Sequence, residues 1–268
     1  MFYAIVFTFG LMVGSFLNAV IYRLHSGESI VKARSHCPKC GHELGWFELI
    51  PVISFLVQRG KCRACNKGIS IQYPLVELAT ATLFTLSAWP GCGASSQHCY
   101  AGLWFFGSIL IVIFVYDLRH TIIPDKIIYP AIFIAFFYQL FSIVDVELVT
   151  SYELRVTSYE DFGHSLLSAV AASAFFLSIF LISKGKWIGF GDVKLAFFMG
   201  LILGWPAIFV ALFVAFLLGG IIGVGLIASG KKTMKSEVPF GPFLVAGTFV
   251  ALFWGNGLVG WYLGLLVN

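Results

Sequence analysis

The sequence predicts an all-α, polytopic membrane protein of about eight transmembrane helices with a small zinc-ribbon-like cytoplasmic domain. Three observations predict this class. Of the 268 residues, 59% are apolar and only 11% are charged, whereas soluble domains carry roughly 25% charged residues. Apolar runs close to the length of a bilayer span, about 20 residues, recur along the chain. Four cysteines form two C-x-x-C pairs inside the one long polar segment.

The apolar runs define the expected spans. They lie at approximately residues 2–22, 73–89, 100–116, 127–144, 164–183, 193–205, 206–228 and 242–266. The sixth run is short, and Trp205-Pro206 can form a tight turn after it, so eight spans fit the sequence better than seven.

The first run could be confused with a signal peptide. It has no basic residue before its apolar core and no clear cleavage site before Arg23, so we expect a retained helix. The sequence therefore divides into a first transmembrane helix at 1–22, a cytoplasmic zinc-binding domain at 23–72 and a membrane-embedded domain at 73–268.

The distribution of cations predicts the orientation. Sixteen of the seventeen Lys and Arg residues lie in four segments, 23–72, 117–126, 184–194 and 229–241. An excess of Lys and Arg marks the cytoplasmic side of a membrane, so these segments are expected in the cytoplasm and the N-terminus outside. The acidic loop expected at 145–163 then faces outward. The net charge of +4 follows from this topology and gives no reason to expect a nucleic-acid partner.

The polar segment 23–72 carries the pattern of a structural zinc site. Its cysteines, Cys37, Cys40, Cys62 and Cys65, have the spacing C-x2-C-x21-C-x2-C. Two such pairs can supply four thiolates in a tetrahedron, and a segment of about fifty residues usually needs a metal to be stable. Free thiols or redox-active pairs are the alternative. The apolar residues 46–55 between the pairs can either pack on this domain or lie against the membrane surface.

Two aspartates near the ends of apolar runs are the candidate catalytic residues. Asp192 follows a Gly-Phe-Gly turn, and Asp117 ends the run at 100–116. A carboxylate at the edge of a membrane span is costly unless it has a partner or a task. We interpret Asp117 and Asp192 as a membrane-embedded proteolytic pair. For Asp117 alone, an interfacial ion pair with Arg119 or Lys126 remains an alternative.

A pair of carboxylates can hydrolyse a peptide bond without a metal. Two carboxylates about 3 Å apart share one proton, so one acts as base and the other as acid. Both aspartates are expected on the cytoplasmic side, where a substrate helix can unwind in contact with water. The sequence shows no serine with a recognisable base and no His-Glu zinc-protease helix.

Other polar residues have simpler interpretations. Pro124 makes a continuous helix through its region improbable, so Asp117 and Asp125 should lie on either side of a turn. Asp125 is then a charge in the first turn of the next helix. Glu77 is an acid in the first turn of the helix that begins at Tyr73-Pro74, stabilised by the helix dipole, with a role in the catalytic site as the alternative.

Two histidines and two further cysteines show no ligand spacing. His120 and His164 are expected to be interfacial polar residues. Cys92 and Cys99 fall in an expected exterior loop, where a disulfide and two free thiols are equally compatible with the sequence.

An ordered set of motifs makes the chain resemble the type IV prepilin leader peptidases. The motifs are GSFLN (14–18), YRL (22–24), RSHCPKC (34–40), LIPVIS (49–54), RGKCRAC (59–65), YPLVE (73–77), the segment 117–125 and GFGDVKL (189–195). A single C-x-x-C or G-x-G-D motif is weak evidence, but the set spans nearly the whole chain in order.

The resemblance implies an aspartic peptidase of the GxGD type in the bacterial inner membrane, with Asp117 and Asp192 as its catalytic pair. It implies cleavage of prepilins and type II secretion pseudopilins after the glycine that ends a short basic leader. The new N-terminal residue, usually Phe, would then be methylated from S-adenosylmethionine. The four-cysteine domain accompanies the methylating members. No glycine-rich nucleotide fingerprint marks where the methyl donor would bind, and the sequence leaves a homo-oligomer open.

Two other classes of function also place carboxylates or cysteines in a membrane protein. An ion- or proton-coupled transporter also uses intramembrane carboxylates, but it would keep them near the middle of the bilayer and often shows inverted halves. A structural anchor for the zinc domain gives no reason for two carboxylates at facing helix ends. Both classes therefore explain less of the sequence than a peptidase does.

Overall fold

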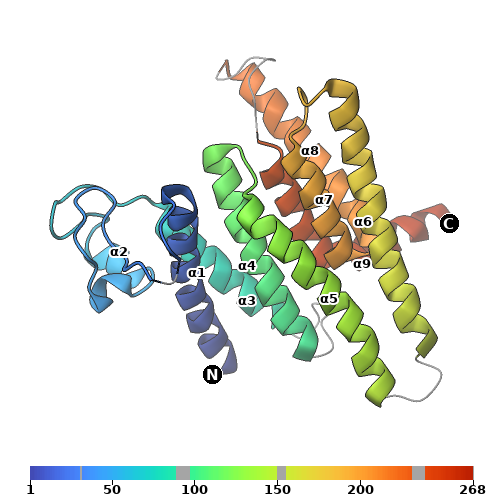
Figure 1. Ribbon diagram of the computed structural model, residues 1–268, viewed down its shortest axis with the longest axis horizontal. Coiled ribbons are helices and arrows are strands. Elements are labelled where there is room, and N and C mark those ends of the chain that lie inside the picture. The colour runs from blue at the N-terminus through green and yellow to red at the C-terminus, as the bar shows by residue number, and fades with distance from the viewer. Residues whose placement is uncertain (31, 89–96, 150–154, 231–238, 268) are drawn as a thin grey trace. The chain divides into compact units, whose positions relative to one another are not determined.

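The described part of the chain is helical apart from its loops. The structure, a computed structural model, describes all residues except 31, 89–96, 150–154, 231–238 and 268. The elements, which can be followed in Figure 1, are α1 Phe2–Ser26, η1 Trp46–Leu49, α2 Ile53–Val57, α3 Gln72–Ser87, α4 Gln97–His120, α5 Asp125–Val149, α6 Arg155–Ser183, α7 Phe190–Leu203, α8 Ala207–Ala228 and α9 Gly241–Val267.

Each of the eight predicted apolar runs overlaps one of the long helices, α1 and α3 to α9. Among the described residues, four helical segments are long and apolar enough to cross a membrane: Phe2–Ser26, Gly102–His120, Phe162–Ser183 and Ala207–Ala228. A bent pair in α9, Gly241–Gly255 with Gly257–Leu265, adds a fifth if it counts as one span. The chain is thus an all-helical membrane protein.

The loop predicted at 145–163 is wrong in its extent. Helix α5 continues to Val149 and α6 begins at Arg155, so most of the predicted loop is helical. Hydropathy marks only the apolar part of a helix, and both helices continue into polar sequence.

The chain forms two compact units, Met1–Val112 and Ile113–Asn268. In the first unit, α1 and α3 run antiparallel in close contact. A Cβ atom on Gly10 would lie 2.6 Å from the Cα of Ala81, and one on Gly14 would lie 2.6 Å from the Cα of Glu77. Glycine at these two positions lets the helix backbones approach, as in other membrane helix pairs.

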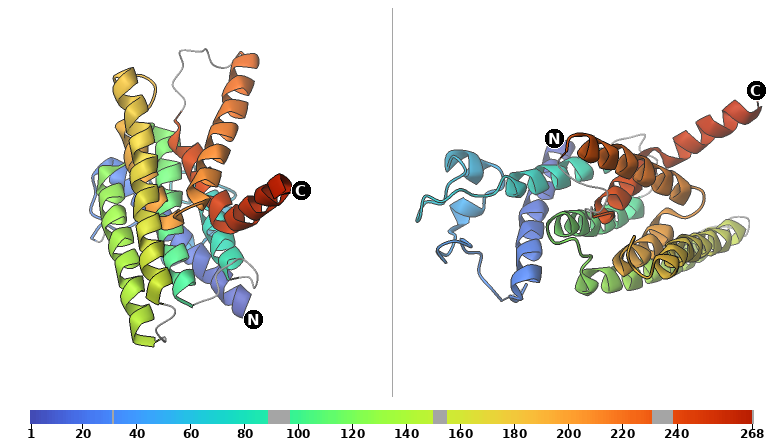
Figure 2. Two further views of the ribbon diagram at one scale, coloured as in Figure 1. Left: turned by 90° about the vertical axis from the view of Figure 1, so that its right-hand side faces the viewer. Right: turned by 90° about the horizontal axis from the view of Figure 1, so that it is seen from above.

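The second unit packs around α7. This helix contacts α5, α6 and α9, and α8 packs along α9; these helices can be followed from two further directions in Figure 2. A Cβ atom on Gly200 of α7 would lie 2.3 Å from the Cα of Ala169 in α6, so the backbones of these two helices approach closely at this point. Leu195 and Phe198 of α7 are fully buried. Helix α7, whose first turn carries Asp192, therefore packs against several neighbouring helices.

Candidate active site and cysteine cluster

Asp117 lies in the last turn of α4, immediately before a turn. The Thr121 backbone N–H donates to the Asp117 carbonyl at 2.8 Å, and Thr121 has a φ of 54°, so the helix ends here. Pro124 follows, and α5 begins at Asp125. The prediction that Asp117 and Asp125 lie on either side of a turn is confirmed. Asp117 is buried, with 4% of its surface exposed.

Asp192 lies in the first turn of α7, which Gly189 precedes as the capping residue. The Gly189 backbone N–H donates to the Asp192 carboxylate, and the Asp192 backbone N–H donates to the Gly189 carbonyl at 3.1 Å. This reciprocal pairing fixes the carboxylate against the start of the helix, where free N–H groups favour a negative charge. Asp192 is 8% exposed.

The structure brings these two aspartates together. The Asp117 carboxylate is close enough to Asp192 to interact with it electrostatically, although 75 positions separate them in the sequence. Their elements, the end of α4 and the start of α7, belong to the same compact unit. Like charges that interact in this way disfavour simultaneous ionisation of both carboxylates.

Gly241 completes the surroundings of Asp117, and sequence reasoning missed it. Its backbone N–H, at the start of α9, donates to the Asp117 carboxylate. A Cβ atom on Gly241 would lie 2.5 Å from Asp117 Oδ2, so a side chain at this position and the carboxylate would overlap. The Pro-Phe-Gly-Pro sequence at 239–242 was the available signal, because it places a residue without a side chain at the start of an apolar run.

Ile123 fills the space between the two helix starts. A Cβ atom on Gly191 would lie 3.1 Å from the Ile123 Cβ, and one on Gly241 would lie 3.5 Å from its Cδ1 atom. Ile123 is 5% exposed. The second glycine of the Gly-x-Gly-Asp sequence therefore permits close approach of the α4–α5 turn, as expected for a residue without a side chain.

Asp125 and Lys194 form an ion pair between α5 and α7. The Lys194 Nζ also lies 4.8 Å from the centre of the Tyr129 ring and 5.1 Å from that of Phe190, within the range of cation–π attraction. The prediction that Asp125 is in the first turn of its helix is confirmed. Its pairing with a residue two positions after Asp192 adds a contact that holds the start of α7.

The prediction for Glu77 is wrong. Helix α3 begins at Gln72, and Glu77 lies beyond its first turn. Its Oε2 atom instead accepts a hydrogen bond from the Val52 backbone N–H at 2.7 Å. The Glu77 carboxylate therefore binds the backbone of the loop that follows η1. The position of Glu77 in its helix does not indicate this long-range contact.

The four predicted zinc ligands come together in the first unit. Among the described residues, Cys37, Cys40, Cys62 and Cys65 form the group able to hold a metal ion, and their sulfur atoms lie within 4.8 Å of one another. Tetrahedral zinc with Zn–S bonds of about 2.3 Å requires S–S separations of about 3.8 Å. A small contraction of the cluster would therefore satisfy zinc.

The two cysteine pairs repeat the same local structure. In the first, the Cys37 N–H donates to the His42 carbonyl at 2.9 Å, and in the second the Cys62 N–H donates to the Lys67 carbonyl at 3.0 Å. Isolated β-bridges join His36 to Glu43 and Lys61 to Gly68. The left-handed position of each turn is taken by Gly41 (φ 72°) and by Asn66 (φ 55°). In the second pair Asn66 thus takes the place that Gly41 has in the first.

Backbone N–H groups point at the sulfur atoms. Burial raises the pKa of the Cys37 thiol, but hydrogen bonds from the Lys39 and Cys40 backbone outweigh it and lower this pKa to about 7. A hydrogen bond from His42 lowers the pKa of Cys40, whereas desolvation and the neighbouring Cys65 and Cys37 sulfurs raise it to about 11. The cluster thus favours one thiolate and disfavours a second beside it.

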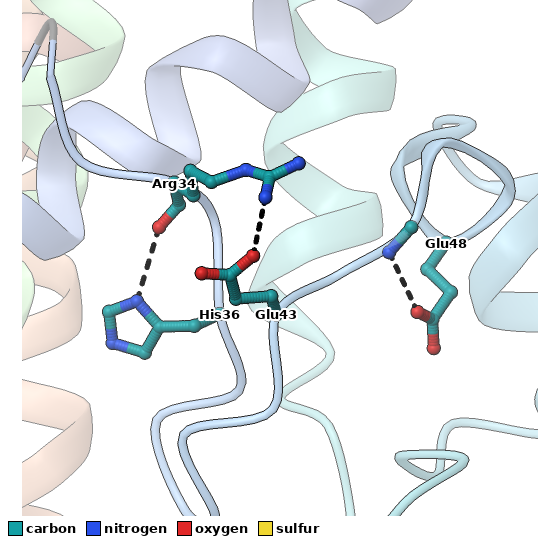
Figure 3. Close-up of polar contacts among 5 residues, drawn as sticks. Arg34, His36, Glu43 and Glu48 are labelled. Atoms are coloured by element: carbon teal, nitrogen blue, oxygen red, sulfur yellow. Dashed lines mark hydrogen bonds and ion pairs between the residues drawn. The ribbon is translucent and has the colours of Figure 1, made fainter.

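Figure 3 shows polar contacts among residues on either side of the first cysteine pair in the sequence. Arg34 Nη1 donates to Glu43 Oε2 at 2.7 Å, and His36 Nδ1 lies 3.2 Å from the Arg34 carbonyl oxygen. The Gly45 backbone N–H donates to Glu48 Oε2 at 2.9 Å. The Arg34–Glu43 ion pair joins the two sides of the loop that carries Cys37 and Cys40, and the other two contacts are local.

The alternatives predicted for Cys92 and Cys99, a disulfide or two free thiols, lie outside the part of the chain that the structure describes. Cys92 is not among the described residues, and the side chain of Cys99 is not described.

Comparison with known protein families gives two matches. Residues 8–90 match the Bacterial Peptidase A24 N-terminal domain, and residues 104–224 match the Type IV leader peptidase family. The first match contains all four clustered cysteines, and the second contains both aspartates.

Curated relatives match over nearly their full lengths. A protein of Bacillus subtilis (strain 168) is 32% identical, with 99% of each chain covered. One of Aeromonas salmonicida (strain A449) is 29% identical over 100% of this chain and 96% of its own. A protein of Pseudomonas aeruginosa is 30% identical over 95% of this chain and 91% of its own. All three are named prepilin leader peptidase/N-methyltransferase.

A search of solved structures found no match. The family models cover most of the sequence, and the relatives align with it from end to end. The chain therefore belongs to the type IV leader peptidase family.

Proposed function

We propose that this protein removes the short basic leader from type IV prepilins and type II secretion pseudopilins at the cytoplasmic face of the membrane. It then N-methylates the new N-terminal residue, usually Phe. The names of the full-length relatives support both activities. The single observation that carries the peptidase activity is the convergence of two buried carboxylates, Asp117 and Asp192, from the end of α4 and the start of α7.

In this proposal the two carboxylates hold one proton between them. The ionised carboxylate takes a proton from water as the water oxygen attacks the scissile carbonyl carbon. The protonated one then gives its proton to the amide nitrogen, the C–N bond breaks, and the leader leaves with a new carboxylate. The pair again holds one proton, so no metal is needed for this step.

The surrounding backbone supports the charge that the pair must carry. Gly241 offers an N–H at the start of α9 to Asp117, and Gly189 offers one at the start of α7 to Asp192. Helix N-termini stabilise nearby anions. We infer that these two N–H groups keep the pair from binding a second proton.

We propose that the four cysteines hold structural zinc. The fit rests on four sulfur atoms within 4.8 Å of one another and on the two matching turns that present them. Cys37, Cys40, Cys62 and Cys65 would bind the ion as thiolates, and zinc would supply the cross-link that a small domain of this size needs. S-adenosylmethionine would supply the methyl group for the second reaction.

The proposed topology has eight spans in the bacterial inner membrane, with the N-terminus outside. Eight long helices at the predicted positions and the concentration of Lys and Arg in four loops support it. The division into 1–22, 23–72 and 73–268 remains a prediction. A transporter is not favoured, because the relatives that match from end to end are named as peptidases.

The proposal is tested with purified protein in lipid nanodiscs, a prepilin peptide that spans the cleavage site, and isotopically labelled S-adenosylmethionine. Mass spectrometry should show loss of the leader, followed by one labelled methyl group on the new N-terminus. An uncleavable peptide, with the glycine before the cleavage site replaced, should gain no label. Absence of cleavage by protein that is folded and zinc-loaded would contradict the peptidase assignment.

A further inference from the structure

An apolar surface on the first unit is not used by either proposed site. It is formed by residues 46–57, which include η1 and α2, and we call it the interfacial segment. No apolar residue of either helix is buried. Six large apolar side chains of the segment are exposed to between 41% and 69%: Trp46, Phe47, Leu49, Ile53, Leu56 and Val57. Large exposed apolar side chains gathered in one short segment indicate an interaction site.

The interfacial segment is tied to the helix pair by a buried carboxylate. Glu77 of α3 is 6% exposed. It accepts a hydrogen bond from the Val52 backbone N–H at 2.7 Å and another from the Ser15 hydroxyl of α1. A carboxylate buried between two apolar helices is costly, so these bonds to a loop indicate a task for it.

Val52 adopts a backbone conformation that a β-branched residue rarely takes. Its φ is 60° and its ψ is −50°, and the Ile53 N–H donates to the Pro51 carbonyl across it. This is the γ-turn of positive φ, which is rare and strained. Such a conformation persists only where the surroundings determine it, and the bond to Glu77 is one such restraint.

The register of α1 and α3 gives the depth of this tether. Gly14 lies against Glu77, and Arg23 is nine residues further along α1, which corresponds to about 13 Å of helix. The Glu77 side chain leans toward the start of α3, toward the level of Tyr73, whose carbonyl accepts a bond from Asn18. Even with this lean, Val52 lies nearer than Arg23 to the middle of the α1–α3 pair, measured along the helix axis.

Arg23 marks the polar end of the first span. Its guanidinium donates to the carbonyls of Ile30 and Ala33 at 2.6 and 2.7 Å, and α1 is one of the helices able to cross a membrane. A loop tethered deeper than this residue meets hydrocarbon or the headgroup boundary. Irregular backbone at that depth must have its N–H groups paired, which is the bond that Glu77 supplies to Val52.

We propose that the interfacial segment inserts its apolar side chains into the bilayer leaflet at the Arg23 end of α1, with Glu77 as the residue that fixes its depth. The partner is lipid: acyl chains around Leu56 and Ile53, and anionic headgroups around the basic residues that follow at 59–63. Apolar side chains next to Lys and Arg are typical of segments that lie in the membrane interface. The inference depends on α1 crossing the membrane and is independent of the catalytic activities.

Site-specific photo-crosslinking in the full-length protein tests this placement. A benzophenone amino acid is introduced at Leu56 or Trp46, with Glu43 and Lys67, exposed polar positions of the two cysteine turns, as matched controls. The protein is illuminated in nanodiscs of phosphatidylethanolamine and phosphatidylglycerol, without substrate. Lipid adducts several-fold more abundant at the two apolar positions than at the controls are expected. Equal lipid labelling at all four positions, or cross-links at Leu56 only to protein, would overturn the proposal.

Glu77 variants test the tether. A glutamine at this position can still accept the Val52 N–H, whereas leucine cannot. With the probe at Leu56, we expect Glu77→Gln to keep the wild-type yield of lipid adduct and Glu77→Leu to lose several-fold. An unchanged yield in a Glu77→Leu protein that retains its zinc would remove Glu77 from the depth-fixing role. Should that variant fail to fold, the comparison of positions in the wild-type background still decides the placement.

Discussion

Replacing Gly241 by alanine tests how tightly the acidic pair is enclosed. The new Cβ atom would lie 2.5 Å from Asp117 Oδ2, and ordinary contact begins at 3.4 Å, so the carboxylate or the start of α9 must move by about 0.9 Å. Gly241 is not among the residues with positive φ, so alanine fits its backbone. The change is therefore a local displacement of one carboxylate.

The expected loss of cleavage rate in the Gly241→Ala protein follows from this displacement. A misplacement of about 1 Å at a reacting group can cost on the order of 100-fold in rate, and loss of the bond from the Gly241 N–H would add to it. We expect kcat/KM for prepilin cleavage to fall by about 100-fold or more. The melting temperature should change little, because the clash is confined to one carboxylate at the start of a helix.

The assay compares cleavage rates in nanodiscs with thermal unfolding of the same samples. Gly220→Ala is the matched control, since a Cβ atom at Gly220 would meet nothing within 4 Å, and it should leave the rate unchanged. A Gly241→Ala protein with wild-type kcat/KM would refute the arrangement in which α9 begins against Asp117.

Three further predictions concern the rest of the molecule. Replacing Cys37 and Cys40 together by serine should release zinc and lower the melting temperature; bound metal measured by mass spectrometry at or near one ion per chain in this variant would contradict the four-cysteine site. Because thiols must lose protons to bind metal, a chelator should remove zinc from the wild-type protein more readily as pH falls from 8 to 6, with about one proton taken up by each released thiolate. Zinc loss that does not depend on pH would argue against thiolate ligands. Lys194→Met should slow cleavage about tenfold by loosening the start of α7, with Lys184→Met as the control, and the exchange of charges in an Asp125→Lys, Lys194→Asp protein should restore part of the rate. No loss in Lys194→Met would show that the pair with Asp125 does not position Asp192.

Much of the helical framework could be predicted from the sequence. Helices in this chain are long and apolar, so their positions follow from hydropathy, and Pro124 correctly separates Asp117 from Asp125. The cysteine cluster was equally predictable, because the spacing of the pairs determines which side chains can meet. Features that depend on a local sequence pattern, such as apolar runs, a proline or a cysteine spacing, were therefore predicted correctly.

Contacts between distant segments could not be predicted in the same way. The bond from Gly241 to Asp117, the ion pair of Lys194 with Asp125 and the tether from Glu77 to Val52 each join elements far apart in sequence. Nothing in the local pattern around Glu77 distinguishes a helix-dipole acid from an acceptor for a loop N–H. The helical ends at 145–149 and 155–163 were missed for a related reason, since their polar residues resemble a loop.

The most direct test of the central claim is the cleavage activity of Asp117→Asn, Asp192→Asn and the double variant in lipid nanodiscs, each checked for zinc content and unfolding temperature. If the carboxylates act as one unit, each single variant should be as inactive as the double one, because both remove the same proton-sharing pair. Clear residual cleavage of prepilin by either single variant would show that its aspartate is not part of the catalytic pair.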